Sequence, residues 1–168
     1  MSILTEFKKR VPNFPEQYKI SLFDNISKTG GGSAETKSNL GKHFENNYEL
    51  YCYSFRLGIK AEKRIKFSPG DRKVNFSHPI EFWGRKSNSK RKDFDWIQNA
   101  LFIYCFNRTK LDLIALDKGE VKIKSQVDLL IETLEEYTYG GLYLLANEIE
   151  SVNGPLPDVF FTDLLLED

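Results

Sequence analysis

The sequence has little of what metal sites, disulfide frameworks and membrane segments require. Its 168 residues include two cysteines, one methionine and two histidines. Cys52 and Cys105 stand without a CxxC motif or a matching Cys/His cluster, which predicts two core thiols rather than a metal site or a disulfide. No apolar run approaches the roughly 18 residues of a membrane span, and the first residues lack the basic-then-apolar order of a signal peptide. We therefore expect a soluble, cytoplasmic protein without membrane contact, metal or cofactor.

Net charge is also absent, because 24 lysines and arginines balance 24 aspartates and glutamates. The two signs of charge are unevenly distributed along the chain. Residues 56–92 hold twelve basic side chains against three acidic ones, whereas residues 93–168 hold five against fifteen. The chain is therefore strongly polarised along its length, with a basic middle and an acidic C-terminal half.

The clearest helix is predicted over residues 125–150, where apolar residues recur at intervals of three or four. Ser125 is placed to cap its start. Gly140 and Gly141 fall within this pattern and predict a close helix crossing or a kink, the alternative being that one helix ends there and another begins. Four acids are expected to lie largely on the solvent side of the helix. These are Asp128, Glu132, Glu135 and Glu136.

Further helices are predicted around Ile3 to Arg10, over residues 43–63 and from Asp93 to about residue 110. In the last of these, Phe102, Ile103 and Phe106 make the helix apolar nearly all round. That composition predicts the central, most buried helix of the protein.

Residues 109–124 fit two structures. Thr109 with Asp112 can cap a short helix that ends at Gly119, whereas LDLIAL and VKIK can pair as two strands around an Asp-Lys-Gly turn. We favour the helix.

Together these patterns predict a mainly α protein: a compact helical domain of about four to five helices with a loop-rich basic segment. Residues 1–40 are expected to form a loose, partly flexible N-terminal arm, residues 41–150 the helical domain, and residues 151–168 an acidic, apolar tail. The tail can fold back on the domain or dock into a partner. The glycine-rich stretch at residues 27–43 departs from a Walker A loop, so a flexible connector is expected there.

The basic stretch at residues 64–92 is the candidate binding site. Its lysines and arginines alternate with Phe67, Phe76, Phe82 and Trp83, a mixture suited to phosphates and to unpaired bases. The alternative is a solvated loop whose aromatics plug the core, and His78 is expected to be a loop or core histidine. The candidate nucleic-acid-binding residues are Lys63, Arg64, Lys66, Arg72, Lys73, Arg85, Lys86, Lys90, Arg91 and Lys92.

A rival from another class is a Mg²⁺-dependent nuclease of the PD-(D/E)xK type. Asp112 followed by Glu120 and Lys122 reproduces the order of two metal-binding carboxylates and a lysine that helps position the attacking water. This chemistry requires the hairpin form of residues 111–124, because the carboxylates must converge from adjacent strands.

Four segments carry a resemblance to a known family. They are ETKSNLGKHFENNYELYCYSFRLGI from Glu35, HPIEFWG from His78, LDLIALDKGE from Leu111 and LLIETLEEYTYGGLYLL from Leu129. Over residues 35–150 the chain resembles the small proteins associated with the Dnd (DNA phosphorothioation) system of bacterial defence islands. The resemblance implies a small, mainly helical accessory subunit beside an ATPase, helicase, nuclease or modification enzyme, and it carries no catalytic residue.

From the charge pattern and the resemblance we expect a non-catalytic subunit of a bacterial DNA-modification, restriction or anti-phage complex. Its basic face would contact DNA and its helical surfaces would contact partner proteins. The apolar residues outside the main stripe of the long helix, Tyr139 and Tyr143 among them, also predict a possible homo-oligomer.

Overall fold

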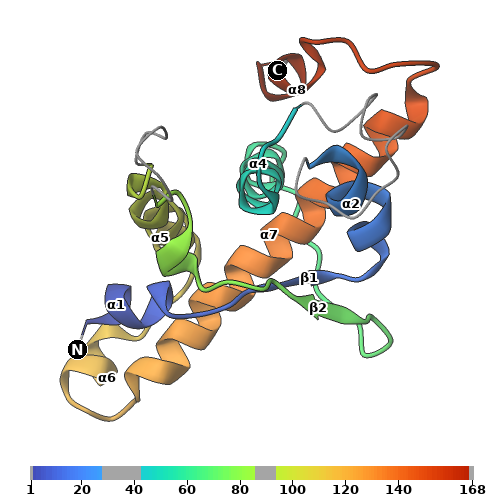
Figure 1. Cartoon of the computed structure of the whole chain (residues 1–168). Helices are drawn as coiled ribbons and strands as arrows, with labels where there is room; N and C mark the ends of the chain where they lie inside the picture. The colour runs from blue at the N-terminus through green and yellow to red at the C-terminus, as the bar shows by residue number, and fades with distance from the viewer. Residues whose placement is uncertain (1, 28–42, 86–93, 167–168) are drawn as a thin grey trace. The chain divides into compact units, whose positions relative to one another are not determined.

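The computed structural model describes residues 2–27, 43–85 and 94–166. Of these residues 61% are helical, which confirms the mainly α prediction. The α-helices are α1 (Ile3–Lys8), α2 (Asp24–Ile26), α4 (Asn47–Lys60), α5 (Trp96–Arg108), α6 (Leu113–Asp117), α7 (Ile123–Ser151) and α8 (Phe160–Leu166), labelled as in Figure 1. A π-helical turn, η1 (Lys19–Phe23), a 3₁₀ turn, η2 (Ile80–Phe82), and a two-stranded sheet of β1 (Asn13–Pro15) and β2 (Lys73–Asn75) complete the described elements.

The chain divides into two compact units that do not follow sequence order. Unit 1 comprises Met1–Asn13 and Asn75–Glu135, and unit 2 comprises Phe14–Val74 and Glu136–Asp168. The chain therefore passes from one unit to the other within β1, within β2 and within α7. The described residues 2–27, from the range predicted as a loose arm, contribute α1 to unit 1 and η1 and α2 to unit 2.

Unit 1 is built around aromatic side chains from the loop between β2 and α5. Trp83 is 1% exposed, and its ring lies 4.9 Å from that of Phe76, centroid to centroid. The Trp83 indole N–H donates to the backbone oxygen of His78 at 3.1 Å. From α5, the Gln98 side-chain amide donates to the backbone oxygens of Glu81 (3.0 Å) and Trp83 (2.8 Å). Two of the four aromatics predicted for base contact are therefore core residues, and His78 is a loop residue as predicted.

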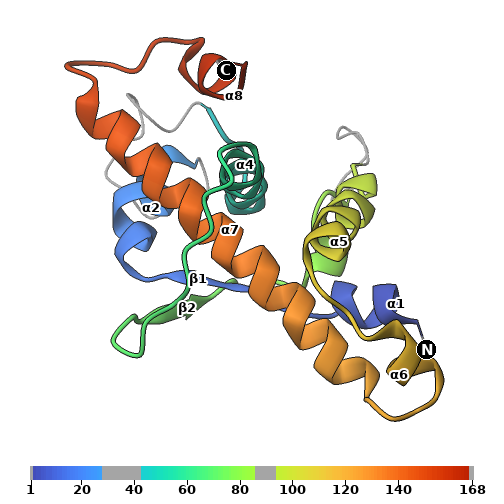
Figure 2. The same ribbon diagram turned by 180° about the vertical axis from the view of Figure 1, so that it is seen from behind.

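Helix α5 packs on α1 with one face only. The two helices lie side by side in Figure 2. Phe7 of α1 is fully buried, and its ring meets that of Phe102 of α5 edge to face at 5.5 Å. On the other side of α5, Ile103 is 56% exposed and Tyr104 is 50% exposed. The prediction that this is the most buried helix is wrong, because a helix with apolar residues all round is buried only if other elements surround it.

Residues 111–124 form the predicted short helix rather than a hairpin. The Asp112 carboxylate accepts from the backbone N–H of Ala115 at 2.9 Å and so caps α6. The Thr109 hydroxyl instead donates to the backbone oxygen of Cys105 at 2.7 Å. The hairpin prediction is wrong, and the adjacent strands that would bring Asp112, Glu120 and Lys122 together are not formed by this segment.

Unit 2 is organised by the crossing of α4 and α7 (Figure 1). A Cβ atom added to Gly141 would overlap the backbone oxygen of Ser54, and one added to Gly58 would overlap that of Tyr137. The glycines therefore let the two backbones approach. The close crossing predicted from Gly140 and Gly141 is confirmed, and the alternative of two separate helices is wrong because α7 runs unbroken. The helix begins at Ile123, so Ser125 lies within its first turn rather than capping it.

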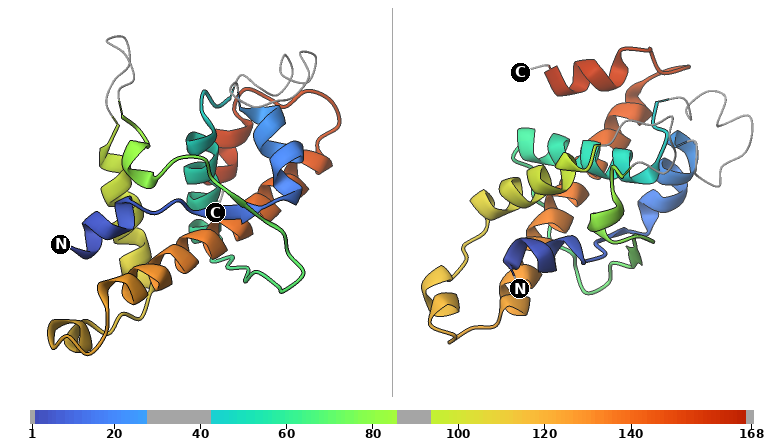
Figure 3. Two further views of the ribbon diagram at one scale, coloured as in Figure 1. Left: turned by 60° about the horizontal axis from the view of Figure 1, so that its bottom comes forward. Right: turned by 60° about the vertical axis from the view of Figure 1, so that its left-hand side comes forward.

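The C-terminal segment folds back on unit 2 as α8, which lies beside α4 in both views of Figure 3. Phe161 is 8% exposed and packs edge to face on Phe44 and Tyr53, with ring centroids 5.0 and 5.4 Å away. The Tyr53 hydroxyl donates to the backbone oxygen of Phe161 at 2.7 Å. Helix α4 itself begins at Asn47, later than predicted, which leaves Phe44 in the preceding segment. Most of the glycine-rich stretch predicted as a connector lies outside the described residues.

Candidate nucleic-acid interface

The structure places the predicted site residues in three groups. Lys63, Arg64, Lys66, Arg72 and Lys73 belong to unit 2, on the segment between α4 and the end of β2. Arg85 belongs to unit 1, where its guanidinium lies 5.3 Å from the centre of the exposed Phe82 ring. The remaining four lie outside the described residues. These are Lys86, Lys90, Arg91 and Lys92.

Arg64 anchors the basic segment rather than facing a ligand. Its guanidinium forms an ion pair with the carboxylate of Glu136, a side chain that is only 3% exposed. The same guanidinium lies 5.7 Å from the centre of the Tyr137 ring. A buried carboxylate needs such a partner, because an unpaired charge away from water is costly.

The two consecutive glutamates of α7 were predicted on its solvent side, and this prediction is wrong. Glu136 is 2% exposed and Glu135 is 6% exposed. In unit 1, Glu135 accepts from the backbone N–H (2.7 Å) and the side-chain amide (3.0 Å) of Asn13. In unit 2, the Ile65 N–H donates to the backbone oxygen of Glu136 at 3.1 Å, next to the Arg64 ion pair. Both carboxylates hold chain segments in place.

Small residues on α7 bring the basic segment close to the helix. A Cβ atom at Gly140 would overlap the backbone oxygen of Lys63. Glu136, Tyr137, Gly140 and Gly141 therefore form the part of α7 on which α4 and residues 63–65 pack. Its role in this chain is structural.

Aromatic rings continue outward from this docking point and alternate with lysines. The Phe67 ring lies 5.1 Å from that of Tyr139, and the Lys73 ammonium lies 4.4 Å from the Phe67 centroid. One turn further along α7, the Tyr143 ring carries the Lys63 ammonium at 5.1 Å. We add Lys66, which is exposed and directly precedes Phe67 in the sequence. We call this set the aromatic-basic strip: Lys63, Lys66, Phe67, Lys73, Tyr139 and Tyr143.

Two tyrosines of this region, Tyr139 and Tyr18, have phenol pKa values raised above the ordinary value. Burial raises the pKa of Tyr139 above its ordinary value of 10.0, and the nearby Asp71 carboxylate raises it further. Tyr18 lies beneath the strip, with its ring 6.1 Å from that of Tyr139, and burial likewise raises its pKa. The strip therefore combines aromatic rings with lysine side chains, a combination that suits bases and phosphates.

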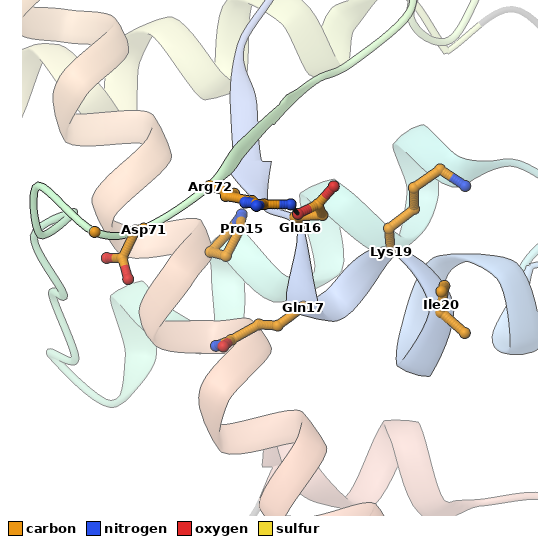
Figure 4. A pocket seen from close by; sticks show the side chains of 8 residues that line it. Pro15, Glu16, Gln17, Lys19, Ile20, Asp71 and Arg72 are labelled. Carbon is orange, nitrogen blue, oxygen red and sulfur yellow. Dashed lines mark ion pairs between the residues drawn. The ribbon is translucent and has the colours of Figure 1, made fainter.

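An open groove of about 550 Å³ lies beside Arg72 in unit 2 (Figure 4). Arg72 and Glu16 meet at its centre, with 3.8 Å between guanidinium nitrogen and carboxylate oxygen. The Arg72 side chain is 85% exposed, so this ion pair contributes little to stability and leaves the guanidinium accessible to a phosphate. The groove is lined by Pro15, Glu16, Gln17, Lys19, Ile20, Gly70, Asp71 and Arg72.

Part of this candidate interface cannot be recognised in any single stretch of the sequence. Phe67 and the lysines stand in the predicted basic stretch, but Tyr18 comes from about fifty residues earlier and Tyr139 and Tyr143 from about seventy later. The available signal was the spacing of Tyr139 and Tyr143, four apart and outside the apolar stripe of α7. No local pattern indicates that Phe67 packs on Tyr139.

Comparisons with protein-family models, curated proteins and solved structures found no match to this chain. Within the described part of the chain, no group of three or more His, Cys, Asp and Glu side chains is arranged to hold a metal ion. No helix among those residues has both the length and the apolarity to cross a membrane.

Proposed function

We propose that this chain is an accessory subunit that contacts DNA, with partner proteins, in a bacterial DNA-modification or anti-phage complex. The observation that carries the DNA contact is the aromatic-basic strip, where Lys63 lies over the Tyr143 ring, Lys73 lies over the Phe67 ring, and all three rings are exposed or half-buried in one unit. The bacterial defence setting rests on the family resemblance alone.

The strip favours DNA that contains unpaired bases. Lysines bind the phosphate backbone of any nucleic acid, whereas exposed rings gain stacking energy only from bases that are not stacked in a duplex. Tyr143, which is 41% exposed beside Lys63, is the best placed ring for such stacking. Single-stranded DNA is therefore expected to bind more tightly than a duplex of the same length.

Fluorescence anisotropy with labelled single-stranded and duplex oligonucleotides, over a salt series from about 50 to 200 mM, tests this proposal. We expect Lys66→Glu combined with Lys73→Glu to weaken binding about ten-fold or more and to flatten the salt dependence, because two phosphate contacts are lost. Lys118→Glu combined with Lys122→Glu is the matched control. It changes net charge equally, but on exposed residues of unit 1, and should leave most of the affinity.

The aromatic contribution is tested by Tyr143→Ala, which should weaken single-stranded binding about ten-fold and duplex binding much less. Tyr104→Ala is its control, since Tyr104 is an exposed tyrosine beneath an arginine in unit 1. Equal losses in the two lysine variants, or no binding by the intact chain at about 50 mM salt with or without partner proteins, would refute the DNA contact.

A further inference from the structure

The outer side of α5 carries a regular seam of three apolar residues and one asparagine, of which Ala100 is half-buried and the other three are exposed. Trp96, Ala100, Ile103 and Asn107 follow one another at intervals of four, three and four residues, which is the spacing of the contact positions in a coiled coil. Trp96 is 62% exposed and Ile103 is 56% exposed. The opposite face of the helix buries Gln98, Leu101 and Cys105 within unit 1. A 13-residue helix thus has one face used by its own unit and a second face with the pattern of a helix contact.

The seam is complementary to itself in the antiparallel direction. If two copies of α5 cross at a two-fold axis midway between Ala100 and Ile103, each Ala100 lies level with Ile103 of the partner subunit. Each Trp96 then lies level with Asn107 of the partner subunit. Every layer of the contact combines one large and one small side chain, so side chains of alternating size can interdigitate.

Charge favours the same direction. Asp95 precedes the first residue of α5 and Arg108 is its last residue. In an antiparallel pair Asp95 of each copy lies level with Arg108 of the partner subunit, and the helix dipoles oppose each other. A parallel pair would place two aspartates at one end and two arginines at the other.

We propose that the α5 seam binds the α5 seam of a second copy of this chain, antiparallel and in the register that places Ala100 opposite Ile103 of the partner subunit. The contact involves unit 1 only and is independent of the DNA contact proposed for unit 2. A single pair of 13-residue helices buries less surface than a standard stable interface. The dimer is therefore expected to form reversibly over a micromolar concentration range.

Sedimentation velocity on the full chain, from about 1 to 500 µM, tests the association. The wild type should shift from monomer to dimer, and Ile103→Glu should remain monomeric over the whole range. Ile114→Glu is the matched control: Ile114 is 70% exposed on α6 in the same unit, outside the seam, and the variant should dimerise as the wild type does. Far-UV circular dichroism of each variant establishes that it is folded.

A mixing experiment tests the register. Ala100→Lys alone and Ile103→Glu alone should both be monomeric, because each places a charge in an apolar layer. Mixed in equal amounts they should form a heterodimer, since the introduced lysine then lies level with the introduced glutamate of the partner subunit. A parallel pair would not bring these two residues together.

Three results would overturn the proposal: a wild type that stays monomeric at about 500 µM, an Ile103→Glu variant that still dimerises, or equal loss of dimer in Ile114→Glu. Absence of heterodimer in the mixture of folded variants would overturn the antiparallel register. Tryptophan emission offers an independent readout, because Trp96 is exposed and Trp83 is buried. Emission should shift to shorter wavelength with concentration in the wild type and stay constant in Ile103→Glu.

Discussion

Helices α4 and α5 are nearly equal in length, and α5 is the more hydrophobic of the two. Yet α4 buries seven of its fourteen residues and α5 buries three of its thirteen. The difference lies in the neighbouring element. Helix α4 meets Gly141 on α7, which allows the two backbones to approach, whereas the outer face of α5 meets solvent. The hydrophobicity of a helix indicates how much free energy its burial would contribute. Whether the helix is actually buried depends on a neighbouring element whose shape allows close packing.

Replacing Gly141 by alanine should have the largest effect on stability, because the added methyl group forces α4 away from α7. The added methyl group would overlap the backbone oxygen of Ser54, and neither helix backbone can yield without losing its packing. We expect the free energy of unfolding, measured by chemical denaturation, to fall by about 3 kcal/mol or more. Gly70→Ala is the control, since a Cβ atom at Gly70 meets nothing within 4 Å. A loss below about 1 kcal/mol would show that the crossing is looser than described.

The contributions of the two faces of α5 to stability can be compared by truncating one side chain on each face. Leu101 is 4% exposed, and Leu101→Ala should lower the free energy of unfolding by about 3 kcal/mol. Ile103 is 56% exposed, and Ile103→Ala should change it by less than about 0.5 kcal/mol in dilute solution. Similar losses from both substitutions would mean that the outer face is covered within the chain. Denaturation at low protein concentration is essential, so that self-association does not contribute.

A smaller change than that for Gly141 or Leu101, and one that depends on pH, is expected from the Cys52 thiol of α4. Burial raises its pKa well above the ordinary value of 9.0, and the Glu49 carboxylate adds to the shift. Below pH 9.0 the thiol is protonated in both the folded and the unfolded chain, and its contribution to stability is fully present. As the pH rises from 9.0 towards the folded pKa, only the unfolded chain loses the proton, so the free energy of unfolding falls.

Between about pH 8 and pH 10, the wild type should therefore lose about 1 kcal/mol more unfolding free energy than Cys52→Ala, as measured by parallel denaturation curves. Burial also raises the pKa of Tyr53, which lowers stability at high pH in both proteins and cancels in the difference. Parallel pH profiles would show that the thiol is not held away from water.

Much of the fold follows from the sequence. The three- and four-residue spacing of apolar side chains identified α7, and Asp112 with its neighbours identified the short helix α6. Gly140 and Gly141 indicated the close crossing without naming its partner, because Ser54 and Gly58 lie more than eighty residues away. The helical pattern failed for Glu135 and Glu136. That pattern assumes that α7 is covered along one apolar stripe only. At Glu135 and Glu136 other segments of the chain also pack on the helix, and they supply Asn13 and Arg64 as partners of the two carboxylates.

The candidate interface was predicted in part. Clustering of lysines with Phe67 is visible along the chain, and that prediction of DNA contact stays a prediction. Phe76 and Trp83 have the same local composition around them but serve the core of unit 1, since Gln98 and His78 bind the backbone and indole of Trp83. Composition alone does not distinguish an aromatic side chain that faces outward from one that faces inward.

The glycine contact between α4 and α7 also constrains how the sequence can change through evolution. Gly58 lies against the backbone of Tyr137 and Gly141, and Gly141 lies against Ser54 and Gly58. A larger residue at either glycine is tolerated only if the two helices move apart, which would relax the requirement at the other. In related sequences these positions should therefore be lost together or kept together, so that their joint pattern identifies distant relatives better than overall identity does.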